Sequence, residues 1–127
     1  MNYSPKLKQK KGTKYFIAPE IGEKDEYDGY QADIFSLGMA LISLTTGKYK
    51  FYQLDSENKF YQYIKNGNKV EFWKFFGEKI NKSLSDELKD ICFKMVSYDP
   101  EKRPTIKKIF EHKRFWNMND EEIKKYK

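Results

Sequence analysis

Cysteine and histidine are almost absent from this chain of 127 residues, and their scarcity excludes several kinds of site. Cys92 is the only cysteine, so no disulfide can form within the chain, and no cysteine–histidine set has metal-ligand spacing. Cys92 lies in an apolar helical pattern, which predicts a small buried side chain. His112, the only histidine, lies in the last expected helix, where we expect it to pack or cap. The residues themselves therefore predict no catalytic and no metal-binding group.

Long apolar runs are also absent. Residues 1–5 contain no apolar core of a signal peptide. The longest apolar stretch, near residues 34–44, is too short and too interrupted to cross a bilayer. We therefore expect a soluble cytoplasmic protein that has no membrane partner.

Arginine is scarce although the chain is basic, with a net charge of +6 and an isoelectric point near 9.2. Of the 25 basic residues only Arg103 and Arg114 are arginine, the residue that reads guanine edges and grips phosphates with two hydrogen bonds. The charge fits a solvated lysine-rich surface, or a module that attracts polyanions weakly. We expect the first, with no specific nucleic-acid partner.

Aromatic residues, by contrast, are abundant at 17%, within a hydrophobic fraction of 39%. This content is too high for a disordered tail, and the length suits one domain. Residues 33–45 are apolar around nearly the whole circumference, which predicts a helix buried on all sides with Asp33 as its N-cap. Amphipathic patterns predict further helices at 56–66, at 85–96 and after Thr105. The chain is therefore expected to be mainly α.

Four short motifs follow one another along the chain. They are G-T-K-Y-F-I-A-P-E at 12–20, D-I-F-S-L-G at 33–38, L-T-T-G at 44–47 and D-P-E-K-R-P-T at 99–105. In this order they resemble the C-terminal part of the C-lobe of a eukaryotic serine/threonine protein kinase domain, from the end of the activation segment to the last helix. The resemblance covers residues 10–116 and implies a partial kinase-like C-lobe helical bundle.

The resemblance also divides the chain. It implies a flexible basic segment at 1–11, which would be the remnant of an activation loop, and a partial kinase domain at 12–116. A charged C-terminal tail would follow at 117–127. Many kinases are phosphorylated four residues before the threonine that Thr13 matches, but Gln9 stands there and cannot accept phosphate. Control by a phosphate docked on arginine is therefore not expected.

Four residues acquire roles through the resemblance. Glu20 and Arg103 would form a buried structural ion pair, and deleting one partner of such a pair costs roughly 3–5 kcal/mol; the alternative is two separate surface charges. Thr13 would line the substrate-binding site and favours a serine/threonine parent, or it only forms a turn. Asp33 would anchor the catalytic loop, which these residues do not include, and would otherwise cap its helix or face water.

The kinase motifs that bind nucleotide and metal are missing from these 127 residues. There is no G-x-G-x-x-G, no H-R-D and no D-F-G. ATP and Mg²⁺ are therefore implied only for a full-length parent. Three hypotheses stay open: a fragment of an active serine/threonine kinase, a kinase-derived module that binds a protein partner, and a lysine-rich polyanion-binding module. Because the catalytic loop and the preceding helix are missing, helix 34–44 should expose an apolar patch that could receive a partner.

Overall fold

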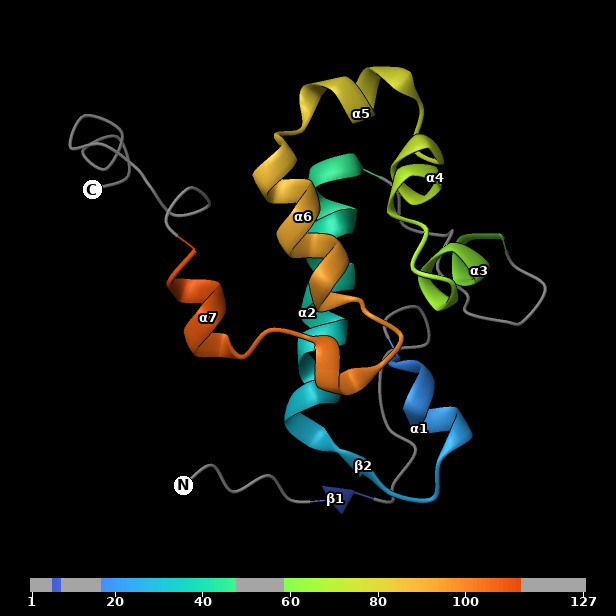
Figure 1. Cartoon of the computed structure of the whole chain (residues 1–127), viewed down its shortest axis with the longest axis vertical. Helices are drawn as coiled ribbons and strands as arrows, with labels where there is room; N and C mark the ends of the chain where they lie inside the picture. The colour runs from blue at the N-terminus through green and yellow to red at the C-terminus, as the bar shows by residue number, and fades with distance from the viewer. Residues whose placement is uncertain (1–5, 8–16, 48–58, 113–127) are drawn as a thin grey trace.

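The computed structural model describes residues 6–7, 17–47 and 59–112, and within them the mainly α fold is confirmed. A long central helix is surrounded by short ones (Figure 1). The elements in chain order are β1 Lys6–Leu7, α1 Pro19–Glu23, β2 Tyr27–Asp28, α2 Gly29–Thr46, α3 Lys59–Lys65, α4 Lys69–Lys74, α5 Glu78–Ser83, α6 Asp86–Met95, the 3₁₀ helix η1 Pro100–Lys102 and α7 Ile106–Phe110.

A two-stranded antiparallel sheet lies at one end of α2 (Figure 1). Lys6 is opposite Asp28, and Leu7 is opposite Tyr27. Of the segment 1–11, which is expected to be flexible, the structure describes residues 6–7, and these two pair with β2. The pairing gives the backbone of residues 6–7 hydrogen-bond partners within the fold.

Helix α2 begins earlier than the apolar pattern predicts. Asp28 is the N-cap, and its Oδ1 accepts hydrogen bonds from the backbone N–H groups of Tyr30 at 2.8 Å and Gln31 at 3.1 Å. The prediction that Asp33 caps this helix is therefore wrong. Asp33 lies one turn inside the helix, on its exposed side. Gly47 ends the helix in the left-handed conformation, with φ of 72°, which glycine adopts without strain.

The core lies between α2 and α6, which run side by side (Figure 1). Gly38 permits this close approach. A Cβ atom placed on it would lie 2.8 Å from the Cβ of Met95 and 2.9 Å from a methyl of Val96. Phe35 and Met39 are fully buried in the same layer.

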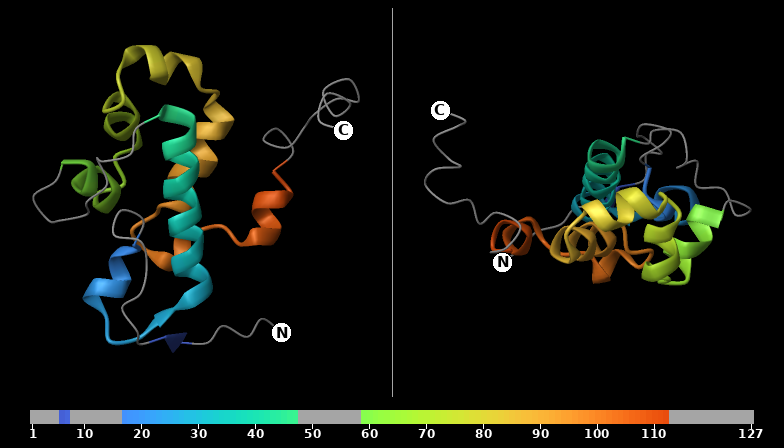
Figure 2. Two further views of the ribbon diagram at one scale, coloured as in Figure 1. Left: turned by 180° about the vertical axis from the view of Figure 1, so that it is seen from behind. Right: turned by 90° about the horizontal axis from the view of Figure 1, so that it is seen from above.

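One face of α2 is not buried, so the apolar patch predicted on helix 34–44 is present, whereas the burial on all sides suggested by its all-round apolar character is not complete. Leu37 is 41% exposed and Leu44 is 74% exposed. Seen from behind, α2 lies in front of α6, and none of the other described helices crosses it on that side (Figure 2). The all-round apolar sequence therefore does not indicate which face the core covers, but the expected apolar patch lies on the face that carries Leu37 and Leu44.

Aromatic packing joins the short helices to this core. The ring of Phe72 in α4 lies 4.8 Å from that of Phe60 in α3 and 5.0 Å from that of Phe93 in α6. The boundary of α6 agrees with the sequence pattern, because Ser85 caps it by accepting from the N–H of Leu88 at 3.1 Å. The helix expected at 56–66 corresponds to α3, and the first residues of that expected range, 56–58, lie outside the described residues.

Candidate functional site

The turn between α6 and α7 places Arg103 in the interior. Asp99 begins this turn by accepting a hydrogen bond from the N–H of Glu101 at 3.0 Å, and Pro100 starts η1 at a position where its missing N–H costs nothing. The N–H of Arg103 then bonds the carbonyl of Pro100 at 3.2 Å. The local sequence therefore makes a compact turn that directs the arginine side chain inward.

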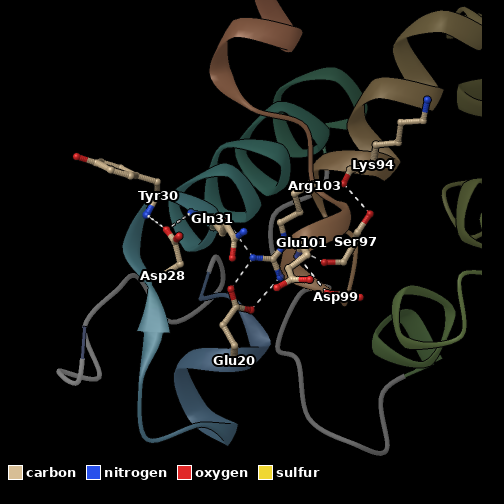
Figure 3. Close-up of polar contacts among 9 residues, drawn as sticks. All are labelled: Glu20, Asp28, Tyr30, Gln31, Lys94, Ser97, Asp99, Glu101 and Arg103. Atoms are coloured by element: carbon tan, nitrogen blue, oxygen red, sulfur yellow. Dashed lines mark hydrogen bonds and ion pairs between the residues drawn. The ribbon is translucent and has the colours of Figure 1, made fainter. Parts of the chain in front are cut away.

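Arg103 and Glu20 form a buried ion pair with two hydrogen bonds (Figure 3). Nη2 donates to Oε1 at 2.8 Å and Nη1 donates to Oε2 at 2.5 Å. The side chains are 0% and 3% exposed. This two-point geometry is one that a planar guanidinium provides and a lysine ammonium cannot.

The remaining contacts of Arg103 connect three parts of the fold. Its Nε donates to the carbonyl of Ser97 at 2.8 Å, and Nη1 also donates to the carbonyl of Gln31 at 2.9 Å. Its guanidinium carbon lies 4.9 Å from the ring centroid of Phe35, within the range of a cation–π contact. Arg103 therefore joins α1, the start of α2 and the loop that follows α6.

A second polar cluster lies at the other end of α1, and the sequence reasoning missed it. The hydroxyls of Tyr61 in α3 and Tyr98 in the loop after α6 both donate to the carboxylate of Glu23. The two rings meet edge to face at 6.1 Å, and the ammonium of Lys65 lies 5.9 and 5.8 Å from their centroids. These residues match no motif, and nothing in their spacing could have predicted that they meet.

This cluster shifts the titration of both phenols. Burial raises the pKa of Tyr61 above its ordinary value, and the hydrogen bonds with Tyr98 and Glu23 and the charge of Glu23 raise it further. The pKa of Tyr98 is also raised, first by its hydrogen bond to Glu23 and then by burial. Both shifts favour the neutral phenol, the form that can donate to Glu23.

Of the other two residues of interest, only Asp33 lies in the described part of the chain. Asp33 is exposed on α2, and within the described part of the chain no ion pair joins it to Arg103. Thr13 lies outside the described residues. Of the three singled-out residues that the structure describes, it thus brings together Glu20 and Arg103.

The side chains that could bind a metal ion do not cluster in the part of the chain that the structure describes. In segments 17–47 and 59–112 no group of three histidine, cysteine, aspartate or glutamate side chains could hold a metal ion. Burial raises the pKa of the Cys92 thiol to about 12, which keeps it protonated and unreactive at neutral pH. The contacts of Arg103 with Glu20, Ser97 and Gln31 are therefore suited to holding backbone segments in place.

None of the described helices is both long enough and apolar enough to cross a bilayer.

Comparison with known proteins gives a consistent set of similarities. Residues 1–115 match the family model of the protein kinase domain. The chain is 33% identical over 103 residues to a probable serine/threonine-protein kinase of Dictyostelium discoideum, which covers 80% of the chain and 11% of that protein. It is 32% identical over 111 residues to the serine/threonine-protein kinase kin-29 of Caenorhabditis elegans and to an Aurora kinase of Debaryomyces hansenii. These matches cover 87% of the chain in both cases, and 12% and 24% of the relatives.

Proposed function

Because the chain belongs to the protein kinase domain family, we propose that it is the C-terminal part of the C-lobe of a serine/threonine kinase. It would contribute the end of the activation segment and a helical scaffold to the ATP-dependent phosphorylation of serine and threonine in proteins. The chain spans between about a tenth and a quarter of the length of the relatives compared above. A longer parent would supply the groups that bind ATP and Mg²⁺.

The Glu20–Arg103 ion pair is the observation that carries this proposal. It joins the A-P-E segment to the D-P-x-x-R-P turn, 83 positions away in the sequence. The two charges are buried together, and each is hydrogen-bonded to the other. Moving the two segments apart would leave an unpaired charge in the interior, so the pair holds the segments in one arrangement. This arrangement supports the assignment of α1 as the element that ends the activation segment.

Each residue then has a role within a longer kinase. Thr13, seven positions before Glu20, would line the site that receives the substrate residue next to the phosphoacceptor. Asp33 points away from the described core, so it is available to accept hydrogen bonds from the backbone of a catalytic loop. The apolar face of α2 with Leu37 and Leu44 would pack against the remainder of the domain, in a protein we place in the cytoplasm.

A phosphotransfer assay tests this proposal. The purified 127-residue chain, incubated with Mg·ATP and a mixture of serine and threonine peptides, should transfer no phosphate because it contains no H-R-D or D-F-G motif. The polypeptide purified from its native source should transfer phosphate to these peptides. Transfer by the 127-residue chain alone, or inactivity of the native polypeptide under conditions where a control kinase is active, would contradict the proposal.

A second function, a non-catalytic module that binds a protein, is favoured by the same exposed face of α2. Leu37 and Leu44 are two helical turns apart and lie on one side of the helix. Exposed apolar side chains at this spacing suit an apolar helix of another protein. A native polypeptide that lacks phosphotransfer but loses its partner when Leu44 is changed to lysine would support this function over the first.

A further inference from the structure

Helix α1 is too short to be stable without contacts to the rest of the molecule. It has five residues, includes Gly22, and its N-cap residue Ala18 provides no side-chain hydrogen bond. Isolated helices shorter than about 12–15 residues are marginal in water even with favourable sequences. The place of α1 in the fold must therefore be set by contacts between its side chains and the rest of the molecule.

The ion pair of Glu20 with Arg103 is the first of these contacts, but it acts at one end of the helix alone. Glu20 is the second residue of α1, so it fixes the beginning of the helix. Glu23 is the last residue, and the last turn contains no basic residue. A carboxylate at the C-terminal end of a helix opposes the helix dipole. Its presence there calls for a compensating interaction.

The tyrosine pair provides this compensation. Tyr61 donates to Oε1 of Glu23 at 2.9 Å, and Tyr98 donates to Oε2, so both carboxylate oxygens are bound. Tyr61 is 4% exposed and cannot easily move away. The ammonium of Lys65 lies near both rings and adds a positive charge to the cluster. Glu23 is thus bound by groups that come from 38 and 75 positions further along the chain.

We infer that Glu23 is a positioning residue that anchors the C-terminal end of α1 through Tyr61 and Tyr98, independently of the Glu20–Arg103 pair. With both anchors in place, α1 is held at its two ends against α3, α2 and the loop after α6. If the proposed function is correct, this second anchor fixes the orientation of the segment that presents the substrate-binding residues. The anchoring itself does not depend on that function.

Hydrogen exchange of the full chain tests the anchor. In Glu23→Ala the amide of Lys24, which bonds the carbonyl of Glu20 at 3.0 Å, should exchange roughly tenfold faster, the change expected when a hydrogen bond to a charged group is lost. The amides of α6 should be unaffected, because the loss is local. Glu23→Gln keeps a carbonyl acceptor for one tyrosine and should give an intermediate rate.

Two further variants make the result specific. Tyr98→Phe removes one hydrogen-bond donor from a partly exposed residue, and by itself it should accelerate exchange of the Lys24 amide. Added to Glu23→Ala it should change the exchange rate little, because the bond between Tyr98 and Glu23 is already lost in that variant. Glu78→Gln is the matched control, because Glu78 pairs with exposed Lys82 at 2.7 Å and lies far from α1 in sequence. It should leave Lys24 unchanged.

The outcomes separate the anchor from the proposed function. An unchanged rate at Lys24 in Glu23→Ala, or equal acceleration throughout α6, would overturn the anchor. A native polypeptide without phosphotransfer would overturn the kinase proposal and would leave the exchange result as it is. In an active native polypeptide, Glu23→Ala should raise the KM for peptide more than it lowers kcat; the reverse pattern would contradict a role in substrate presentation.

Discussion

Arg103 shows how one side chain can combine several structural roles. It is one of two arginines, and its guanidinium bonds a carboxylate and two carbonyls while lying over the ring of Phe35. A lysine at this position could make one of these contacts well, but not the planar set. The scarcity of arginine elsewhere in a lysine-rich chain agrees with a requirement for this geometry at position 103.

Removing one partner of the buried pair should be strongly destabilising. Glu20→Ala leaves the Arg103 charge buried without its carboxylate, and the free energy of unfolding should fall by roughly 3–5 kcal/mol. Urea denaturation measures this change. The variant that carries both Glu20→Ala and Arg103→Ala should lose less than the two single losses combined, because the second substitution removes the unpaired charge. Additive losses would indicate that the two residues contribute separately.

The tyrosine cluster should make stability sensitive to alkaline pH. The pKa of Tyr61 is raised in the folded state, so its contribution to stability is complete below the ordinary tyrosine pKa of about 10 and is lost as the pH rises beyond it. Unfolding midpoints measured between pH 8 and pH 11 should therefore fall more steeply for the wild type than for Tyr61→Phe. Equal slopes would show that the phenol does not titrate as the cluster requires.

At the scale of elements, the contact of α2 with α6 is set by a glycine. Met95 and Val96 pack directly on Gly38. Gly38→Ala would place a methyl within 3 Å of both side chains, and this overpacking should lower the free energy of unfolding by about 1–3 kcal/mol.

Gly22 offers a matched control for that substitution. It lies in α1, and a Cβ there would meet nothing within 4 Å. Gly22→Ala should therefore be neutral or stabilise by up to about 1 kcal/mol, because alanine is the better helix former. Thermal unfolding of the two variants measures the difference. Similar effects of both substitutions would contradict the close approach of α2 and α6.

Helices α4 and α6 are joined by an ion pair whose contribution to stability should be lost at acid pH. Asp90 in α6 lies 3.0 Å from the ammonium groups of both Lys69 in α4 and Lys94. Burial would raise the pKa of its carboxyl, but the hydrogen bonds and charges of the two lysines outweigh burial and lower it. Its contribution to stability is thus present above the ordinary carboxyl pKa and is lost as the pH falls below it.

Asp90→Asn should remove this dependence. Unfolding midpoints of the wild type should fall more between pH 6 and pH 3 than those of Asp90→Asn. Asp86→Asn is the control, because the Asp86 side chain is almost fully exposed and pairs with Lys89 only at 3.7 Å. It should follow the wild type. If Asp86→Asn reduced the fall of the unfolding midpoint between pH 6 and pH 3 as much as Asp90→Asn, the effect would come from the loss of any negative charge and not from this ion pair.

At the scale of the whole molecule, the basic character is unevenly distributed. Residues 17–47 and 59–112 contain 13 basic and 14 acidic side chains, so the positive excess of the chain lies in the remaining segments. The described helical body therefore offers no general attraction for polyanions. This distribution weakens the lysine-rich polyanion-binding hypothesis for the folded part.

The exposed apolar face of α2 should bind hydrophobic dyes and promote self-association of the chain. Leu44→Lys removes the most exposed apolar side chain of this helix, so it should reduce the binding of a hydrophobic dye and any self-association without lowering the unfolding midpoint. Val70→Lys, at a residue of α4 that is 62% exposed, is the control and should change dye binding less. Dye fluorescence and sedimentation velocity measure both. Equal effects of the two variants would mean that α2 has no special apolar patch.

The sequence predicted the helical content, because apolar residues at helical spacing indicate buried helices, but the all-round apolar character of residues 33–45 did not indicate which face of α2 the core covers. It placed the start of α2 too late because Gly29 and Tyr30 resemble a loop, whereas Asp28 provides the cap. The meeting of Glu20 and Arg103 could be anticipated only through the two family motifs. The Glu23 cluster could not be anticipated at all, since its members come from three elements and follow no local pattern.

The length of the native polypeptide tests the central claim most directly. Intact-mass measurement of the endogenous protein should give a product substantially longer than 127 residues, with H-R-D and D-F-G motifs in the sequence that precedes Met1. That result would support the assignment of this chain to the C-lobe of a serine/threonine kinase. A native product of 127 residues that begins at Met1 would contradict it and would direct attention to a protein partner for the exposed face of α2.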